Sequence, residues 1–563
     1  MTDLSQKPGA GSYLFLTALA LFFGAFLFYP ISYVVAKSVY TKGGYSLVFF
    51  RVIFLDAYMR GAILRSLALG IVTMLTVSVI AIPLAFIATR YRFPGKALMG
   101  GLVLVPMIMP PFVGAIGMRQ IFARFGSINL LLMKMHLISS PVDWLQGGGF
   151  WGIVVLETLH LYPIMYLNVA AGLSSIDPAL EESGMSLGAS GWSLFRRVTF
   201  PLVLPGYFAG AIIVFIWAFT DLGTPLVFDY RNLVAVQIFD KVSDIGEDPT
   251  GYALVVTVIL LTAVCFMAAR YLFGRRRYEL LTRASIAREE SRAGFAGTAA
   301  IYVIVGGVTC LALLPHVSVV LTSIRDKWFM SVLPQSYTLK YYGAVLTHPL
   351  TLPSIKKSIF YSSSSALVDL GLGIGIAYIL TRKRVPGSSI IDGIAMLPLA
   401  LPGIVLAFGY AAGYSGTFLN PRENPVALLI IAYAVRRLPY MVRAAYAGFQ
   451  QSSISLEEAA STLGASPATT LRRVTIPLTM ASLVAGTILA FSFAMLEVSD
   501  SLILAFKEQF YPITKAIYTL LGRIADGPYV ASALGLWGMA LLVLSLLAAA
   551  SFLGRKMGDI FRL

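Results

Sequence analysis

Two stretches of the chain carry acidic, glycine, arginine and proline residues in the same order. The first runs from Leu180 to Gly206 and the second from Leu456 to Ser482, and both lie between long apolar runs. An acidic pair suits a helix N-terminus, a glycine permits a sharp turn, and a proline suits the start of the next helix. Each stretch is therefore predicted to form a short amphipathic helix that begins at the acidic pair, a turn, and a second short segment leading into a span. The residues of the pattern are Glu181, Glu182, Gly188, Arg196, Arg197 and Pro201, and then Glu457, Glu458, Ala459, Ala460, Gly464, Arg472, Arg473 and Pro477.

Ionisable residues also occur inside the apolar runs, where they are costly and often functional. They are Glu157, His160, Asp221, Arg436, Arg437, Glu497 and Asp500. With an offset of 276 residues, His160 aligns with Arg436 and Asp221 aligns with Glu497. Two interpretations remain open, because these side chains could line a substrate path or could pair with one another across helices.

The composition predicts a protein with many membrane spans. Of the 563 residues, only 12% are charged and 58% are hydrophobic, and the mean hydropathy is +0.80. A soluble domain carries about 25% charged residues, and a disordered chain needs low hydrophobicity, so both classes are excluded. The net charge of +16 lies in short clusters between apolar runs, which favours membrane topology over a nucleic-acid partner. Cys265 and Cys310 both lie in apolar runs, so no disulfide framework and no metal cluster of cysteine type is predicted.

The apolar runs are long enough to cross a bilayer, and their number predicts an all-α membrane protein with twelve transmembrane helices. They span residues 13–35, 62–89, 97–118, 150–173, 206–228, 251–273, 298–322, 356–381, 389–413, 426–449, 482–505 and 529–553. The first run has no convincing cleavage site after it, so it is predicted to be a retained helix and not a signal peptide.

The distribution of Lys and Arg predicts that both termini are cytoplasmic, because most basic clusters then fall on one side. The clusters used are Arg90, Arg92 and Lys96; Arg196 and Arg197; Arg275, Arg276, Arg277, Arg283, Arg288 and Arg292; Arg382, Lys383 and Arg384; Arg472 and Arg473; and Arg555 and Lys556. One loop disagrees, since Lys37, Lys42, Arg51, Arg60 and Arg65 would lie outside.

The chain contains an internal repeat. Pro106, Pro110 and Gly117 match Pro398, Pro402 and Gly409 at an offset of 292, and the two loop stretches match at an offset of 276. Because each half holds six helices, both halves enter the membrane in the same sense, as parallel repeats. The predicted organisation is a first repeat over 1–273, a cytoplasmic linker over 274–297 and a second repeat over 298–563. Prolines within the spans are predicted to act either as gate hinges or as static kinks.

The second stretch resembles the EAA motif of permease subunits of binding-protein-dependent ABC importers. Glu458, Ala459, Ala460 and Gly464 match the motif, followed by Val474, Ile476 and Pro477, while the first stretch has Ser183 and Gly184 where the family has alanines. The resemblance implies the type I importer permease fold, in a fused form, in a bacterial inner membrane. It also implies that each loop forms a coupling helix that docks on an ATPase subunit. The implied partners are two ATPase subunits and one substrate-binding protein.

The chain has no catalytic residues of its own in this interpretation. No phosphate-binding loop is present, because Ala97 follows Lys96 where a Ser or Thr is needed. ATP and Mg²⁺ are therefore expected on partner subunits, with no cofactor bound by this chain. The double-length form most resembles ferric-iron permeases. Phosphonate or sugar phosphate, and thiamine or polyamine, remain alternative cargoes, and an ion-gradient-driven secondary transporter is the rival class.

Overall fold

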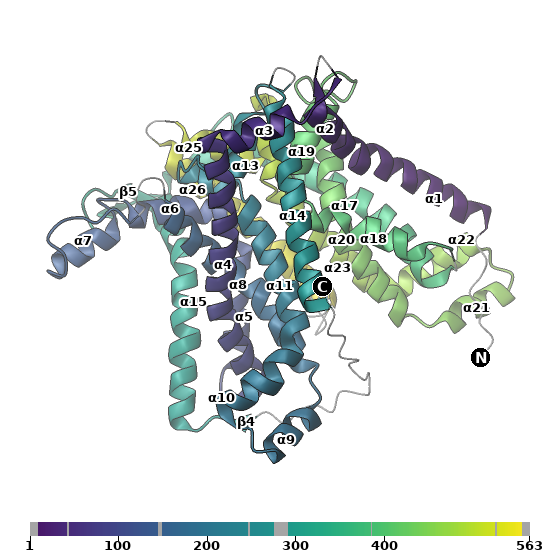
Figure 1. Cartoon of the computed structure of the whole chain (residues 1–563), viewed down its shortest axis with the longest axis horizontal. Coiled ribbons are helices and arrows are strands. Elements are labelled where there is room, and N and C mark those ends of the chain that lie inside the picture. The colour runs from purple at the N-terminus through teal and green to yellow at the C-terminus, as the bar shows by residue number, and fades with distance from the viewer. Residues whose placement is uncertain are drawn as a thin grey trace. The chain divides into compact units, whose positions relative to one another are not determined.

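The structure is a computed structural model that describes residues 9–41, 44–144, 149–245, 248–274, 291–383, 385–523 and 526–553. The described part is overwhelmingly helical (Figure 1). Most of the predicted linker and the basic residues Lys42, Arg384, Arg555 and Lys556 lie outside the described residues. Of that linker the structure describes Gly274 and residues 291–297, and there Arg292 pairs with Arg92 in a short parallel ladder.

The helices of the first half of the chain are α1 (Ala10–Phe23), η1 (Gly24–Phe28), α2 (Tyr29–Val39), α3 (Val48–Leu55), α4 (Ala57–Arg90), α5 (Lys96–Leu104), η2 (Val105–Ile108), α6 (Pro111–Phe122), α7 (Ser127–Lys134), α8 (Phe150–Ser174), α9 (Pro178–Ser186), α10 (Gly191–Leu194), η3 (Phe195–Thr199), α11 (Phe200–Thr220), α12 (Gly223–Val227), α13 (Val234–Asp240) and α14 (Thr250–Gly274). Those of the second half are α15 (Phe295–Ile324), α16 (Lys340–Thr347), α17 (Thr351–Arg382), α18 (Ser388–Ala400), α19 (Gly403–Gly413), α20 (Val426–Gln451), α21 (Ile454–Thr462), α22 (Pro467–Thr470), η4 (Leu471–Thr475), α23 (Ile476–Met495), α24 (Ser499–Leu504), η5 (Glu508–Phe510), α25 (Ile513–Leu521) and α26 (Gly527–Leu553). Short ladders join β1 (Tyr40–Thr41) to β2 (Gly44–Tyr45), β3 (Tyr91–Arg92) to β4 (Ser291–Arg292) and β5 (Arg325–Lys327) to β6 (Ser336–Tyr337).

The predicted membrane helices are present. Within the described ranges, nine helices are long and apolar enough to cross a membrane, or eleven if each of two bent helix pairs counts as one span. The remaining predicted run, 426–449, forms the 26-residue helix α20, which carries Arg436, Arg437 and Arg443. The all-α multi-span fold predicted from the sequence is therefore confirmed.

The two compact units of the structure do not follow the two halves of the chain. Unit 1 comprises the described residues of Met1–Asp56, Ile238–Ile259 and Lys340–Ile560, and unit 2 comprises those of Ala57–Gln237 and Leu260–Leu339. The first helices of the chain thus pack in unit 1 with most of the second half. Helix α15, from the second half, packs in unit 2.

Two matched glycines explain how these exchanged helices are held. In unit 2, a Cβ on Gly117 would lie 2.8 Å from Ser318 of α15, and the Ser318 hydroxyl donates to the Gly117 carbonyl at 2.6 Å. In unit 1, a Cβ on Gly409 would lie 3.1 Å from Pro30 of α2. At Gly117 a larger residue would force the two helices apart, and at Gly409 it would push Pro30 by a few tenths of an ångström. The two glycines match in the sequence repeat, and each contacts a helix from the other half of the chain: Gly117 contacts α15 and Gly409 contacts α2.

Several predicted spans are broken, not straight. The pair Lys96–Met107 and Pro111–Lys134 bends by 90°, and the pair Ser388–Ala400 and Gly403–Gly413 bends by 98°. Proline causes both breaks, because Pro110 and Pro402 lack the backbone N–H that would continue the preceding helix. Helices α11 and α23 also end early, at Thr220 and Met495, before the short helices α12 and α24.

Each of three π-turns ends two residues before a proline. Segments η1, η3 and η4 end at Phe28, Thr199 and Thr475, and the prolines are Pro30, Pro201 and Pro477. A proline ring clashes with the carbonyl four residues earlier, and a widened turn relieves that clash. In each loop, the short segment that was predicted to precede the span is instead continuous with it through the π-turn. The continuous helices run from Gly191 to Thr220 and from Pro467 to Met495.

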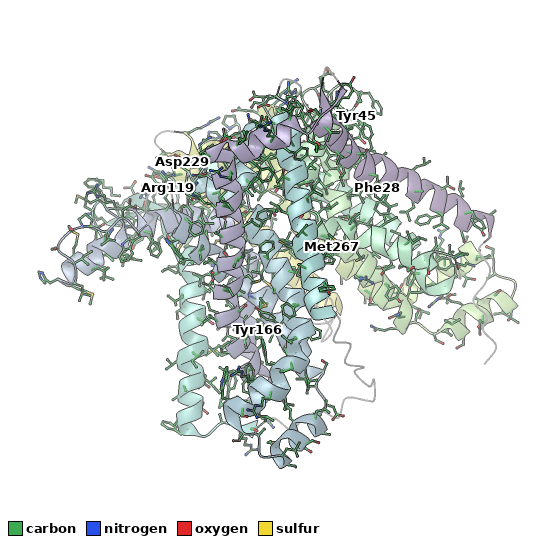
Figure 2. All side chains as sticks on the ribbon, in the orientation of Figure 1. Phe28, Tyr45, Arg119, Tyr166, Asp229 and Met267 are labelled. Carbon is green, nitrogen blue, oxygen red and sulfur yellow. The ribbon has the colours of Figure 1, made fainter. Side chains whose placement is uncertain are left out.

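The outer faces of the helices expose apolar side chains, as membrane contact requires. Phe28 on η1 is 44% exposed and Met267 on α14 is 59% exposed, and Figure 2 shows both side chains on the outside of their helices. The core of unit 2 contains Tyr162, Met165 and Val214, which are completely buried. In unit 1, Met441 and Phe449 of α20 are completely buried against α17 and α23.

Candidate functional site

The two repeated loops form the same structure. Helix α9 begins at Pro178 and helix α21 begins at Ile454, so each acidic pair lies inside its helix and not at its start as predicted. In the first loop an earlier cap is the reason, since the Asp177 side chain accepts a hydrogen bond from the Ala179 N–H, whereas α21 follows Ser453 without a side-chain cap. Figure 1 shows α9 and α10 at the end of unit 2 opposite to α6, and Figure 2 shows Arg119 and Asp229 near the α6 end.

The predicted sharp turns occur at the two glycines. Gly188 has a φ of +88° and Gly464 a φ of +85°, a conformation that residues with a Cβ rarely adopt. The following N–H groups close the same helix ending, because Ala189 donates to the Gly184 carbonyl and Ala465 to the Ala460 carbonyl, both at 3.0 Å. Gly188 and Gly464 therefore have the same backbone conformation and end their helices in the same way.

A leucine is exposed to the same extent at the tip of each loop. Leu187 and Leu463, immediately before the two glycines, are each 89% exposed. Trp192 in the first loop is 73% exposed, and Leu456 in the second is 50% exposed. Arg196, Arg197, Arg472 and Arg473 are also exposed. Exposed apolar groups surrounded by polar residues are typical of a protein interface.

The first acid of the first loop is a buried anchor. Glu181 Oε1 accepts hydrogen bonds at 2.6 Å from Arg90 Nη2, at the end of α4, and from the hydroxyl of Thr199 in η3. The side chains of Arg90 and Glu181 are only 8% and 3% exposed. One carboxylate therefore connects three elements: a span, the loop helix and the π-turn. Its neighbour Glu182 is exposed.

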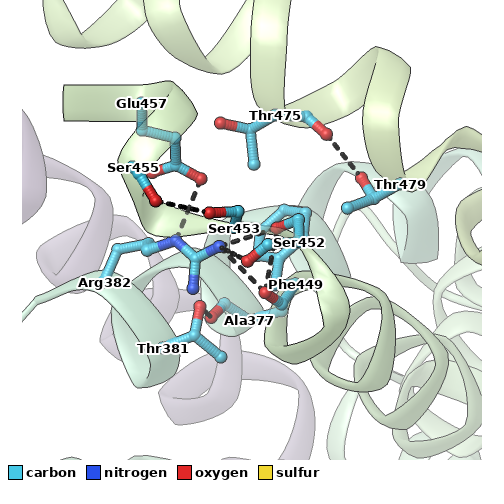
Figure 3. A network of polar contacts seen from close by, with 10 residues as sticks. All are labelled: Ala377, Thr381, Arg382, Phe449, Ser452, Ser453, Ser455, Glu457, Thr475 and Thr479. Atoms are coloured by element: carbon cyan, nitrogen blue, oxygen red, sulfur yellow. Dashed lines mark hydrogen bonds and ion pairs between the residues drawn. The ribbon is translucent and has the colours of Figure 1, made fainter. Parts of the chain in front are cut away.

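The second loop has the equivalent ion pair with a different set of bonds (Figure 3). Glu457 Oε1 accepts from Arg382 Nε at 3.0 Å, and the two side chains are 13% and 7% exposed. Arg382 Nη2 also donates to the Phe449 carbonyl at 2.8 Å and to the Ser452 hydroxyl at 2.7 Å. Burial lowers the pKa of the nearby Lys383 ammonium, although the Glu457 carboxylate opposes that shift. Glu458 is exposed, like Glu182.

In unit 2 the predicted path residues Glu157 and Asp221 come together. Asp221 lies at the break between α11 and α12, where its carboxylate accepts the N–H groups of Gly223 at 3.2 Å and Thr224 at 3.0 Å. Glu157 on α8 is buried and accepts the Thr224 hydroxyl at 3.1 Å. Neither carboxylate forms a salt bridge within the described part of the chain. The pair is therefore an uncompensated acidic site at a helix break.

His160, the third predicted path residue of unit 2, has a structural partner. Its Nδ1 lies 3.0 Å from the Pro106 carbonyl oxygen. Pro110, four residues later, has no N–H to donate to that carbonyl. His160 thus contacts the backbone at the proline break.

In unit 1 the predicted residues pair with one another. Arg436 Nη1 lies 2.5 Å from Glu497 Oε1 and 3.6 Å from Asp500 Oδ2, and Arg437 Nη2 donates to Glu497 Oε2. Glu497 lies at the break between α23 and α24, at the position that matches Asp221. Gly403 makes room for this cluster, because a Cβ there would collide with the Arg436 guanidinium.

Sequence reasoning missed three functional candidates. Arg90 and Arg382 match at the offset of 292 and indicate topology and the repeat, but the sequence alone does not show that they have equivalent partners in Glu181 and Glu457. Asp369, completely buried on α17, was not singled out, and neither of its oxygens has a hydrogen-bond partner in the described structure. Among the described residues, no group of three or more His, Cys, Asp or Glu is arranged to hold a metal ion.

Comparison with known proteins gives consistent matches. The family described as "Binding-protein-dependent transport system inner membrane component" matches residues 80–278 and again 370–557. The chain is 26% identical to the putative ferric transport system permease protein FbpB 1 of Haemophilus influenzae, over 85% of this chain and 76% of that protein. It is also 26% identical to the ferric transport system permease protein FbpB of Actinobacillus pleuropneumoniae, over 84% and 67%.

Shorter proteins match one half of the chain. The molybdenum transport system permease protein ModB of Haemophilus influenzae is 25% identical over 39% of this chain and 95% of its own length. Among solved structures, a chain of a bacterial ABC transporter that imports the acidic polysaccharide alginate is similar, with 18% identity and a TM-score of 0.39 over 47% of this chain and 95% of that chain.

Proposed function

We propose that this chain, which belongs to the family of inner membrane components of binding-protein-dependent transport systems, forms the translocation path of an ATP-driven importer by itself. The family match occurs twice in the chain, and so do the loops with their buried ion pairs. One chain therefore supplies what two half-length permeases would supply together. The chain is a multi-pass inner membrane protein.

The two loops are proposed to be the surfaces on which ATPase subunits dock. The observation that carries this proposal is the matched pair Leu187 and Leu463, which are equally exposed beside glycines of the same backbone conformation. Topology alone would not require an apolar side chain to be exposed at both tips. We infer two ATPase subunits with ATP and Mg²⁺, one binding protein on the other side, and cytoplasmic termini.

Ferric iron is the proposed cargo. The double-length relatives are named as ferric transport permeases, and the uncompensated carboxylates of Glu157 and Asp221 suit a cationic cargo. A phosphonate or sugar phosphate is less well supported, because both arginines of unit 1 are already engaged by Glu497. Nothing in the described geometry favours thiamine or a polyamine over iron.

The docking proposal can be tested with the loop leucines. Replacing Leu463→Ser or Leu187→Ser should reduce copurification of the ATPase and its stimulation by loaded binding protein, because each removes an apolar contact worth about 1.5–3 kcal/mol when fully buried. Leu463→Met and Leu187→Met, which keep the apolar volume, are the matched controls. Full stimulation in both serine variants would refute docking at these loops.

The cargo proposal needs a separate measurement. Uptake of labelled ferric iron should be supported by reconstituted permease, ATPase and binding protein, and identification of the ligand held by the purified binding protein should give iron. A phosphorylated or phosphonate ligand in that protein would replace iron with an anionic cargo, while leaving the importer assignment in place.

A further inference from the structure

The two loop anchors differ in the hydrogen bond between the acid and the threonine of the π-turn. In the first loop, the Glu181 carboxylate accepts both Arg90 and the Thr199 hydroxyl, each at 2.6 Å. Thr475 occupies the position of Thr199 in the second loop, at the offset of 276. Its side chain is completely buried, yet its hydroxyl has no hydrogen-bond partner among the residues described. Glu457, which corresponds to Glu181, is bonded to Arg382.

The missing bond is not explained by a missing group. Glu457 and Thr475 have the same chemistry as Glu181 and Thr199, and α21 packs against η4 as α9 packs against η3. Figure 3 shows dashed lines from Arg382 to Glu457, Ser452 and Phe449, whereas the line at Thr475 leads from its carbonyl to Thr479 and none reaches the Thr475 hydroxyl. A buried hydroxyl without a partner is unfavourable, so this arrangement favours formation of the bond.

The second loop also has room to move. A cavity of about 60 Å³ lies beside the anchor and is lined by residues of α17, α21 and α22, including Tyr378, Glu457 and Thr470. Arg382 is held by the end of α20 through Phe449 and Ser452, so it does not depend on Glu457 to stay in place. The loop helix can therefore shift against a fixed arginine.

We propose that the second loop contains a switching anchor, in which Glu457 accepts the Thr475 hydroxyl in one state of the transport cycle and releases it in the state described. The first anchor keeps Arg90, Glu181 and Thr199 together throughout. Glu457 and Thr475 are thus positioning residues that transmit movement of α21 to the π-turn η4 and to α23. This inference rests on the proposed coupling role of the loops.

The test compares two threonines of the same helix. Thr475→Val removes the hydroxyl at nearly constant volume, and Thr479→Val is the matched control, because the Thr479 hydroxyl donates only to the helix backbone at Thr475 and Ile476. In the reconstituted complex, Thr475→Val should lower stimulation of ATP hydrolysis by loaded binding protein about tenfold, the loss expected for one hydrogen bond to a charged group. The amount of cargo imported per ATP should also fall, and Thr475→Ser should restore both.

The other outcomes separate the two proposals. If the ATPase copurifies but Thr475→Val behaves like Thr479→Val, the switching anchor is refuted and the docking role stands. If the wild-type loops do not bind the ATPase at all, the docking role itself is refuted. Thr199→Val should reduce thermal stability without changing the amount of cargo imported per ATP. If Thr199→Val lowers that amount as much as Thr475→Val does, the proposed difference between the two anchors is refuted. Thr475→Ala, read in the same way, replaces Thr475→Val if that variant does not fold.

Discussion

Glu497 and Asp369 are both buried carboxylates of unit 1, but only one of them is held by arginines. Glu497 accepts Arg436 and Arg437, whereas both oxygens of Asp369 lack a hydrogen-bond partner within the described residues. Removing one member of a buried ion pair leaves an uncompensated charge, while neutralising a buried carboxylate that accepts no hydrogen bond removes a poorly solvated charge. The same chemical change should therefore have opposite effects at the two positions.

The first prediction is that Glu497→Gln destabilises the protein by about 3–5 kcal/mol, because Arg437 loses the carboxylate that it binds and Arg436 keeps only the more distant Asp500. Asp369→Asn should leave the melting temperature unchanged or raise it. Melting of the purified protein in one detergent measures both. Asp392→Asn is the control, since Asp392 pairs with Arg443 at a partly exposed site where a salt bridge contributes little. A lower melting temperature for Asp369→Asn would show that this carboxylate has a partner in solution.

A second prediction concerns Asp221, whose carboxylate caps α12 and lies with Glu157 beside Thr224. Asp221→Asn keeps an oxygen for the cap but removes the charge. We expect slower cargo uptake with normal assembly, because a cationic cargo would lose electrostatic attraction. Initial uptake rates, normalised to the amount of assembled complex, provide the measurement. Unchanged uptake in Asp221→Asn would instead favour a purely structural role for this acid.

The loop turns give a third prediction. A Cβ at Gly188 or Gly464 would meet no heavy atom within 4 Å, so valine there would act only through the positive φ, at about 1–2 kcal/mol. Gly464→Val should abolish cargo-stimulated ATP hydrolysis while the chain still inserts, and Gly188→Val should be milder. Stimulation with and without loaded binding protein measures both. Wild-type stimulation of ATP hydrolysis in Gly464→Val would refute the coupling role. An equal loss of stimulation in Gly464→Val and Gly188→Val would refute only the predicted difference between the two loops.

The sequence was sufficient to predict elements whose cause is local. Long apolar runs predict spans, and a repeated glycine predicts the turns at Gly188 and Gly464, because hydropathy and backbone conformation depend on neighbouring residues. The reason why Gly184 replaces the alanine of the EAA motif could be seen only in the structure. A Cβ there would lie 3.0 Å from Val198, so the glycine lets α9 approach η3 closely, while Ala460 fills the same place in the second loop.

Contacts between distant segments could not be predicted in the same way. Glu181 and Glu457 were selected for a helix N-terminus, but each instead binds an arginine at the end of a span. The partner choice among Arg436, Arg437, Glu497 and Asp500 also depends on where α23 breaks, and the apolar run 482–505 continues across that break. The sequence repeat gives only indirect information about such pairs, because it shows which residues of the two halves are equivalent and not which residues are in contact.

The exchange of helices between the two compact units gives a fourth prediction. The described residues of Met1–Asp56 belong to unit 1, and α15 belongs to unit 2, so each half of the chain contributes helices to both units. Cutting the chain once within residues 275–290 should leave two fragments that stay together in mild detergent. Affinity purification through a tag on one fragment, followed by detection of the other, measures this. Separation of the fragments would contradict the exchange, and the uncut chain with the same tags is the control.

The last prediction concerns the number of copies in the assembled importer. A chain with two loops, two buried acid–arginine anchors and two family matches contains both ATPase-docking surfaces that an importer of this family would need. A second copy would add two further loops with exposed leucines and would need two more ATPase subunits to cover them. We therefore expect one copy of this chain with two ATPase subunits and one binding protein. Native mass spectrometry of the detergent-purified complex measures the composition directly, and a mass with two copies of this chain would refute the prediction.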